Sequence, residues 1–226
     1  MIGQEEQRSD EWYKVRLGNF TGSEVGKLMN KGRKKDELFG ETAKSYIYQV
    51  AAERDMIADV INDDELFELY RKQTEAKSKA MDWGIEKEPE ARELFATKYN
   101  MEMIEVGSCV HPTIPHFASS PDGMCWPSEN EKYAIEIKCP NQATFMRYAT
   151  EIVDGDSLKS VKPEYYWQCQ SHMVCTGASK CYFIAYCPWQ NKPLHVVEIL
   201  PNEADVKELE SRVIAANEMV SEIINK

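Results

Sequence analysis

Two carboxylates and a lysine lie close together in this 226-residue chain, in a pattern that suits chemistry on a phosphate ester. Asp122 stands in a Ser-Pro-Asp-Gly segment, and Glu136 and Lys138 flank Ile137. Mg²⁺ is a hard cation that binds oxygen and keeps several waters, so two carboxylates and the Ile137 carbonyl suffice to hold it. A lysine beside the metal can hold the attacking water, which the metal makes more acidic. These residues predict metal-dependent cleavage of a phosphodiester.

The element that must position Glu136 and Lys138 is a β-strand. Side chains alternate between the two faces of a strand, so residues two apart share a face. Residues 133–139 alternate in this way, which places Glu136 and Lys138 in one site and the neighbouring isoleucines in the core. Two other interpretations stay open, because Glu-x-Lys is also typical of solvated strand edges and Pro-Asp-Gly also forms tight hairpin turns.

Four motifs, in the same order along the chain, resemble those of the lambda exonuclease and YqaJ-like viral recombinase family. The first begins with Glu-Trp-Tyr-Lys-Val-Arg, and the second is a glutamate-rich helix that follows Trp-Gly. The third combines Ser-Pro-Asp-Gly with Glu-Ile-Lys-Cys-Pro, and the fourth is Glu-Tyr-Tyr-Trp-Gln-Cys-Gln. They occupy residues 11–25, 83–91, 120–123 with 136–140, and 164–170.

The resemblance implies a fold and an activity. The fold is a restriction-endonuclease-like PD-(D/E)XK core, an α/β (α+β) architecture with a central mixed five-stranded sheet flanked by helices. The activity is digestion of linear double-stranded DNA from 5′ to 3′, beginning at 5′-phosphorylated ends and leaving 3′ single strands for recombination by strand annealing. By motif, Asp122, Glu136 and the Ile137 carbonyl bind two Mg²⁺ ions, Lys138 activates water, and Glu88 approaches the metals from its helix. Mn²⁺ also suits oxygen-rich sites.

The same resemblance implies a binding site for the terminal 5′-phosphate, formed by Arg16, Ser23, Ser120 and Gln168. A guanidinium offers a planar fork for phosphate oxygens, and hydroxyls and an amide add neutral donors. Residues 21–23 also read as a helix start, whose free N–H groups favour anions. Taken singly, Arg16 is more typical of a surface ion pair and Ser23 of a helix cap, and only the matched series of motifs favours the phosphate site.

Periodicity predicts the remaining elements. Apolar residues recur at helical spacing over residues 46–51 and 94–99. Further helices are expected at 142–150, 163–174 and 202–224, the last capped by Asn202. Strands are expected at 103–110, 116–120, 133–139, 180–187 and 194–200. The strand at 180–187 is almost continuously apolar and is therefore expected at the centre of the sheet.

Composition sets the expected organisation and location. No linker rich in Gly, Ser or Pro divides the chain, so we expect a single nuclease domain over residues 1–226. In it, a helical part over about 1–100 packs on a sheet-containing core over about 101–200, and a C-terminal helix follows. The N-terminus lacks the regions of a signal peptide, and no apolar run reaches membrane-spanning length. A cytoplasmic location is expected.

The cysteines and histidines show no metal-ligand spacing. None of the seven cysteines forms a C-x-x-C pair. Some members of the wider nuclease superfamily bind an iron–sulfur cluster with four cysteines, usually one of them near the N-terminus, but no cysteine precedes Cys109 in this chain. We therefore expect reduced and mostly buried thiols. The histidines, His172 among them, are scattered and are expected to have packing or surface roles.

The net charge of −11 is unusual for a protein that binds DNA, because phosphate contacts normally use basic residues. Local charge decides binding, however, and the basic run at residues 31–35 is a candidate flank for a duplex or simply a solvated loop. An acidic exterior with a basic inner surface would reconcile both facts. Residues 32–39 and 62–79 match no motif, and their role stays open.

Three functions remain in competition. The leading hypothesis is the exonuclease, which acts on double-stranded DNA ends, and the family adds a ring-shaped homotrimer and a single-strand annealing protein as partners. A PD-(D/E)XK endonuclease would also cut closed circles and would need no end reader at Arg16. A non-catalytic DNA-binding module is the third, although the complete set of Asp122, Glu136 and Lys138 argues against it.

Overall fold

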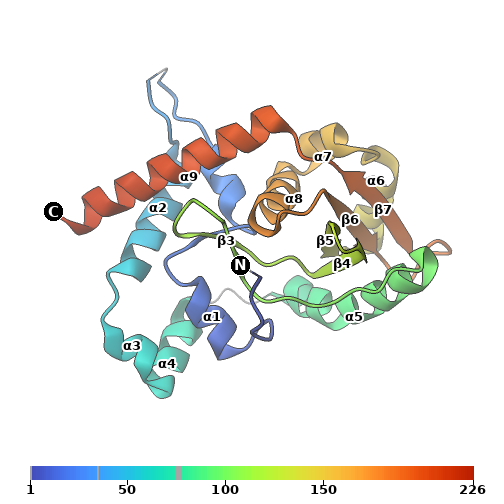
Figure 1. Ribbon diagram of the computed structural model, residues 1–226, viewed down its shortest axis with the longest axis horizontal. Helices are drawn as coiled ribbons and strands as arrows, with labels where there is room; N and C mark the ends of the chain where they lie inside the picture. Colours follow the sequence, from blue (N-terminus) through green and yellow to red (C-terminus); the bar gives the residue numbers. More distant parts are fainter. Residues whose placement is uncertain (1, 35, 75–77) are drawn as a thin grey trace.

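The computed structural model describes residues 2–34, 36–74 and 78–226. Helices and strands are mixed along the chain, so the predicted α+β class is confirmed (Figure 1). The first part is mainly helical and comprises α1 (Asp10–Arg16), the strand β1 (Phe20–Thr21), the 3₁₀ helix η1 (Val25–Met29), α2 (Glu41–Arg54), α3 (Ala58–Asn62), α4 (Asp64–Thr74) and α5 (Lys79–Tyr99).

The second part holds the remaining strands and four further helices. The strands are β2 (Cys109–Val110), β3 (Phe117–Ser119), β4 (Gly123–Ser128), β5 (Glu131–Lys138), β6 (Lys180–Tyr186) and β7 (Leu194–Ile199). The helices are α6 (Gln142–Glu151), α7 (Gly155–Val161), α8 (Pro163–Thr176) and α9 (Glu203–Ile224). None of the helices in the described parts of the chain combines the length and apolarity needed to span a bilayer.

The main sheet has the order β4-β5-β6-β7. β5 runs parallel to β6, whereas the β4–β5 and β6–β7 pairs are antiparallel, so the sheet is mixed as predicted. β6 lies between β5 and β7, and all its residues except the first are buried. The predicted central position of this apolar strand is confirmed.

The strand count differs from the five-stranded expectation, because the strands divide into a four-stranded sheet and a separate three-stranded one. The small sheet has the order β1-β3-β2. Residues 103–110 form a strand only at β2, with one isolated bridge from Ile104 to Met124. Pro121 follows β3 and lacks an N–H for a ladder, so the chain leaves the small sheet there and enters the main sheet at β4.

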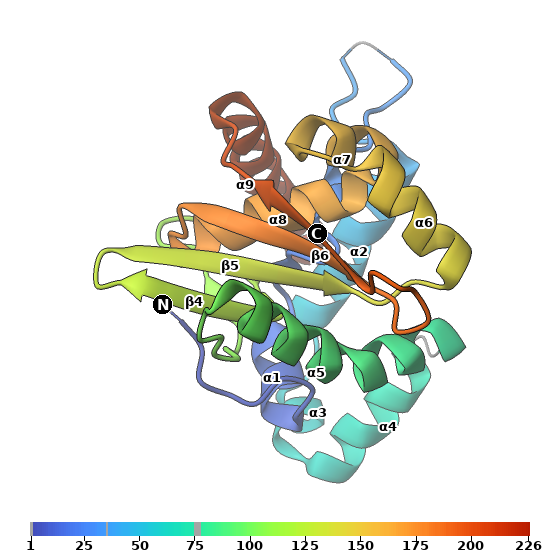
Figure 2. The ribbon, with the colours of Figure 1, turned by 90° about the vertical axis from the view of Figure 1, so that its right-hand side faces the viewer.

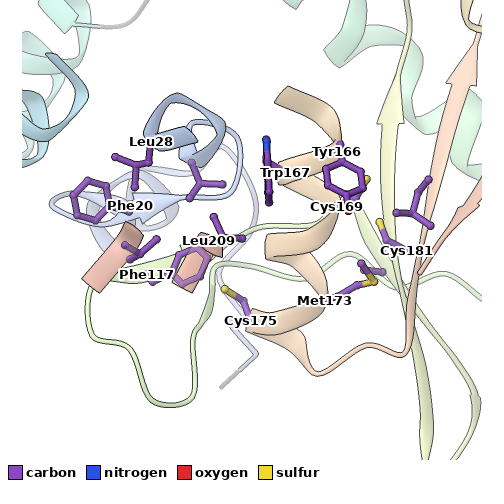
Figure 3. Close-up of a cluster of buried hydrophobic side chains, with 14 of the residues drawn as sticks. Phe20, Leu28, Phe117, Tyr166, Trp167, Cys169, Met173, Cys175, Cys181 and Leu209 are labelled. Carbon is purple, nitrogen blue, oxygen red and sulfur yellow. The ribbon is translucent and has the colours of Figure 1, made fainter. Parts of the chain in front are cut away.

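Helices cover both faces of the main sheet (Figure 2). α5 packs on one face, where Ala91 and Phe95 join the buried side chains of β5 and β6. α8 packs on the other face and separates the sheet from η1, α2 and α9. Figure 3 shows α8 between Cys181 of β6 on one side and the cluster of Phe20, Leu28 and Phe117 on the other. α8 is therefore the central helix of the core, which explains why most of its residues are buried.

The cysteines behave as predicted. All seven are free thiols, and all are buried except the half-buried Cys139. Burial raises the pKa of Cys125 to about 11, and that of Cys139, which also lies near carboxylates, to about 12. These groups are uncharged packing residues at neutral pH.

Helix termini confirm one expectation and correct another. Asn202 caps α9 by accepting hydrogen bonds from the N–H groups of Ala204 and Asp205, both at 3.1 Å. The helix start predicted at residues 21–23 is wrong, because Thr21 ends β1 and the 3₁₀ helix η1 begins only after Glu24, with no side-chain cap. The backbone at Phe20 and Thr21 pairs with β3 instead, as strand β1.

The basic run lies in the loop between η1 and α2. This loop projects past α9, at the opposite end of the molecule from α3 and α4 (Figures 1 and 2). Lys31 pairs with Glu208 at 3.3 Å, Arg33 and Lys34 are exposed, and Lys35 lies outside the described residues. Contact of this loop with DNA stays a prediction.

Candidate active site

A cleft of about 770 Å³ lies where β5 ends, between the main sheet and the N-terminal helices. Its walls come from α1, α2, α4 and α5, with single residues from α6 and α8. Residues 64–74, which match no sequence motif, form the α4 wall. The predicted site residues that line the cleft are Arg16, Ser23, Glu88, Asp122, Ile137 and Lys138.

Asp122 is tied directly to β5. Its N–H donates to the Ile135 carbonyl at 2.9 Å, and its Oδ2 accepts from the Ile137 N–H at 2.6 Å. β4 pairs with β5 only from Gly123 onward, so this carboxylate replaces the missing strand at the edge of β5. The hairpin interpretation is wrong, because the strands on either side of Pro121 belong to different sheets. A Cβ at Gly123 would meet the Met103 side chain at 2.7 Å, so a larger residue here would displace that side chain.

Glu136 and Lys138 share one face of β5, as the alternation predicts. Ile135 and Ile137 point to the opposite face, into the cluster under α5. Glu136 is fully buried and does not reach the cleft surface. Its Oε1 forms an ion pair with the Lys138 ammonium, and its Oε2 lies 2.6 Å from His172 Nε2. Lys138 lines the cleft and therefore covers the glutamate beneath it.

The charges of this group shift one another's titration. Burial, followed by repulsion from Glu136 and Glu88, raises the pKa of Asp122 well above its ordinary value. Burial alone would raise the pKa of Glu136, but the charge of Lys138 and the hydrogen bond with His172 outweigh it and lower that pKa. Burial alone would lower the pKa of Lys138, but the charges of Glu136 and Asp122 outweigh it and raise that pKa. Lys138 is therefore a stable ammonium, and the site gains from any further positive charge near Asp122.

The donor set fits a hard cation. Glu136 Oε1 is buried and makes no hydrogen bond besides its ion pair with Lys138, and repulsion between buried carboxylates marks a place where a cation is favoured. No cluster of three or more His, Cys, Asp and Glu side chains suited to a metal exists in the described parts of the chain. Two carboxylates, the Ile137 carbonyl and waters form the kind of set that Mg²⁺ accepts.

Glu88 lies in the cleft, but arginines engage both of its oxygens. It is 6% exposed on α5, with an ion pair from Arg8 to Oε2 and a 2.7 Å bond from Arg92 Nη2 to Oε1. Arg92 also contacts Glu105 at 2.6 Å. Direct binding of a metal by Glu88 would require one arginine to move, so its predicted approach to the metals stays a prediction.

Arg16 lies among hydroxyl groups. Its Nη1 donates to Ser120 Oγ at 2.9 Å, and its Nη2 to Ser23 Oγ at 3.4 Å. The guanidinium stacks on the Trp12 ring at 4.0 Å, and Trp12 Nε1 donates to the same Ser120 hydroxyl at 3.2 Å. Burial lowers the pKa of Arg16, which nevertheless remains charged. No carboxylate among the described residues forms an ion pair with Arg16, so the surface ion-pair interpretation is wrong.

Gln168 has no hydrogen bond to this group. It lies on α8, is 8% exposed, and its backbone carbonyl accepts a hydrogen bond from the Ser171 hydroxyl at 2.8 Å. Hydrogen bonds therefore link Arg16 to Ser23 and Ser120 among the described residues, and the role of Gln168 as a phosphate ligand stays a prediction.

Sequence reasoning missed three residues that support the site. Gln7 donates from Nε2 to the carbonyls of Val106 and Pro121, both at 2.8 Å, and so fixes the backbone beside Asp122. Arg8 holds Glu88 and has a positive φ of 68°. His172, expected only to pack or to lie on the surface, is buried but bonded to Glu136. The local sequence does not mark Gln7 or Arg8, since their partners lie far away along the chain.

A mixed sheet that presents an aspartate, a glutamate and a lysine at one strand end defines a PD-(D/E)XK-like core. The sequence profile of the YqaJ-like viral recombinase domain matches residues 11–179. The chain therefore belongs to the YqaJ-like viral recombinase domain family, and the predicted resemblance is confirmed.

Solved structures agree with this assignment. The alkaline exonuclease LHK-Exo from Laribacter hongkongensis is 28% identical, with a TM-score of 0.74 over 96% of this chain and 95% of that chain. The complex of LHK-Exo with dAMP gives the same values. A phage-related exonuclease from Haemophilus somnus 129PT shares the fold at 14% identity, with a TM-score of 0.65 over 92% and 95% of the two chains. A search of curated proteins finds no match.

Proposed function

We propose that this protein is a Mg²⁺-dependent exonuclease that degrades linear double-stranded DNA from 5′-phosphorylated ends in the 5′ to 3′ direction. The observation that carries the proposal is that Asp122, Lys138 and Arg16 line one cleft, with the buried Glu136 paired to Lys138 beneath its surface. Membership of the YqaJ-like family and similarity to an alkaline exonuclease support a nuclease that acts on DNA.

In this proposal the residues in and beneath the cleft have separate roles. Arg16, Ser23 and Ser120 bind the terminal phosphate, since a charged fork and hydroxyls are suitable donors for its oxygens. Asp122, Glu136 and the Ile137 carbonyl hold the cation. Bound there, Mg²⁺ would stabilise negative charge on the phosphate and make the attacking water more acidic.

Lys138 acts as a donor in this reaction. Its raised pKa keeps the ammonium charged, so it donates hydrogen bonds to the attacking water and holds it in place. The Lys138 ammonium lies over the Tyr165 ring, 5.0 Å from its centroid, and this contact limits the directions in which the ammonium can point. Both side chains line the cleft.

The remaining family features belong to the same proposal. The product is a 3′ single strand for recombination by strand annealing, a single-strand annealing protein is the partner, and the chain forms one nuclease domain that assembles as a homotrimer. The cation sites are expected to be two, and to accept Mn²⁺ in place of Mg²⁺.

The test uses duplex DNA labelled at either 5′ or 3′ end, beside a closed circular duplex. We expect Mg²⁺-dependent release of the 5′ label from linear DNA, an intact circle and no reaction in EDTA. Cutting of the circle would instead identify an endonuclease. If the protein binds the DNA but cuts it with neither Mg²⁺ nor Mn²⁺, it is a non-catalytic DNA-binding module.

A further inference from the structure

His172 forms a buried hydrogen-bonded chain behind Glu136. The histidine lies on α8 with no exposed surface, and its Nε2 is 2.6 Å from Glu136 Oε2. On its other side, Nδ1 is 2.6 Å from the hydroxyl of Ser119 at the end of β3. That hydroxyl is 3.0 Å from the hydroxyl of Ser171, the residue before the histidine. The chain links β5, α8 and β3, three elements that are distant in sequence.

The backbone makes room for this chain at Gly22. A Cβ added to Gly22 would collide with the Ser119 and Ser171 hydroxyls, since the backbone of residue 22 passes directly over them. The Gly22 N–H also donates to the Ala118 carbonyl at 2.9 Å, which fixes this approach. Because Gly22 packs closely against both buried hydroxyls, the hydroxyls beside His172 have little room to move.

The proton at Nε2 follows from its partner. An ionised carboxylate only accepts hydrogen bonds, so His172 must donate to Glu136 Oε2. The Ser119 hydroxyl at Nδ1 can accept or donate, and in either role it fixes the plane of the ring. A ring held at both nitrogens fixes the carboxylate that it bonds.

The two oxygens of Glu136 are therefore unequal. Oε2 has a short hydrogen bond from a rigid, buried donor. Oε1 has only the ion pair with Lys138, whose long side chain lines the cleft and can withdraw. Oε2 is therefore held by His172, whereas Oε1 pairs with the Lys138 ammonium, which a cation can replace.

We propose that His172 is a positioning residue that makes Glu136 a ligand through Oε1 alone. The histidine retains Oε2, so Oε1, which now pairs with the Lys138 ammonium, would be the oxygen that holds a divalent cation. Lys138 would then be free to donate to the attacking water. This inference rests on the proposed function, because it assigns a role toward the cation of the same site.

The first test measures Mn²⁺ binding by isothermal titration calorimetry, without DNA. His172→Leu removes the donor and is expected to weaken Mn²⁺ affinity about 10- to 100-fold, the usual effect of losing such a partner. His172→Gln is expected to recover much of the affinity, because its amide N–H can donate to Oε2. Ser119→Ala is expected to have a smaller effect of the same sign.

His111→Leu is the matched control. His111 is also buried, and its Nε2 lies 3.2 Å from Glu210 Oε1, but it does not line the cleft. Its loss is expected to leave Mn²⁺ affinity unchanged. Thermal unfolding identifies any variant that fails to fold, and His172→Gln and Ser119→Ala then decide the outcome.

The outcomes separate this inference from the proposed function. Unchanged Mn²⁺ affinity in folded His172→Leu would overturn the inference while the wild type still binds Mn²⁺ and digests DNA. Equal losses in His172→Leu and His172→Gln, or in His172→Leu and His111→Leu, would also overturn it. A Mn²⁺-bound crystal structure with both Glu136 oxygens on the metal would do the same. A wild type that neither binds Mn²⁺ nor cuts DNA would refute the proposed function itself.

Discussion

Lys138 differs from a lysine that acts as a base. Its ammonium lies beside Glu136 and Asp122, which raise its pKa, so it has no tendency to take a proton at neutral pH. A residue of this kind acts by donating hydrogen bonds and by its charge. Replacement with an uncharged side chain of similar length should therefore affect turnover and leave the shape of the cleft intact.

Lys138→Met should lower the rate of cleavage by about 10²- to 10⁴-fold, in the range for loss of a positioned catalytic group. DNA affinity, measured by fluorescence anisotropy with Ca²⁺, should remain near that of the wild type. The matched control is Lys132→Met on the same strand, since that ammonium donates to the Thr176 carbonyl at 2.6 Å outside the cleft. Normal cleavage by Lys138→Met would exclude Lys138 from the active site.

Arg16→Lys tests the phosphate site. Lysine keeps the charge but lacks the fork that now spans Ser23 and Ser120. A hydrogen bond to a charged group contributes about 1.5–3 kcal/mol, so the ratio of rates on 5′-phosphorylated and 5′-hydroxyl ends should fall about 10- to 100-fold. Arg147→Lys, which changes an exposed arginine on α6, should leave the ratio unchanged. An equal loss on both ends would show that Arg16 does not read the phosphate.

At the scale of elements, Asp205 joins three helices. It lies in the first turn of α9, accepts from Lys159 of α7 at 2.7 Å and from the Tyr166 hydroxyl of α8 at 2.6 Å. Burial alone would raise the pKa of Asp205, but these two donors outweigh it and lower that pKa. The junction fixes α9 against the central helix.

Asp205→Asn should reduce the free energy of unfolding at pH 7 by roughly 1–3 kcal/mol, because a partly buried charged hydrogen bond is lost. The folded-state pKa is lower than the unfolded value of about 3.9, so this stabilisation is complete above that pH and disappears as the pH falls through the folded-state pKa. Urea unfolding between pH 7 and about pH 2 should show wild type and variant converging in acid. Asp156→Asn, at an exposed position of α7, should show little difference at any pH, and a pH-independent deficit in Asp205→Asn would contradict the assignment.

Sequence periodicity predicted the elements that bury a regular stripe or an unbroken apolar run. α2, α5, α8, α9, β5, β6 and β7 belong to this group. β1 and β2 have two residues each, too few to show alternation, and their sheet depends on contacts between distant segments. α7 was missed although Asp154 and Ser157 form a capping box at its start.

The candidate site shows the same division. Asp122, Glu136 and Lys138 could be predicted as site residues because they occur in compact motifs whose spacing suits strands. His172 and Arg8 were missed because each reaches its carboxylate partner only through the fold. Such partners have no local signal, since the distance along the chain carries no information about the hydrogen bond.

For the whole molecule, the charge balance of the cleft bears on how strongly the protein attracts DNA. A basic inner surface would reconcile the net charge with DNA binding, but acidic and basic residues line the cleft in equal number among the described residues. The basic ones are Arg8, Arg16, Arg71 and Lys138, and the acidic ones are Glu24, Glu53, Glu88 and Asp122. With a net charge of −11 on the protein and balanced charges in the cleft, the cleft offers phosphate little attraction beyond Arg16 unless a cation joins the site.

DNA affinity should therefore depend on a divalent cation. Binding of a 5′-phosphorylated duplex, measured by fluorescence anisotropy, should strengthen at least about tenfold when Ca²⁺ replaces EDTA at constant ionic strength, since one divalent ion offsets two charges. Asp122→Asn should reduce this cation dependence, and Asp156→Asn should not. Equal affinity with Ca²⁺ and EDTA would indicate that another surface, such as the loop carrying Lys31, supplies the contact.

The position of Gln7 and Arg8 has a consequence for anyone who trims this chain for expression. Boundaries drawn from the family match, residues 11–179, would discard the amide that braces Pro121 and the guanidinium that neutralises Glu88. They would also delete β6, the inner strand on which β5 is aligned. A fragment cut at those boundaries would retain every motif residue and still lack the contacts that support the candidate site.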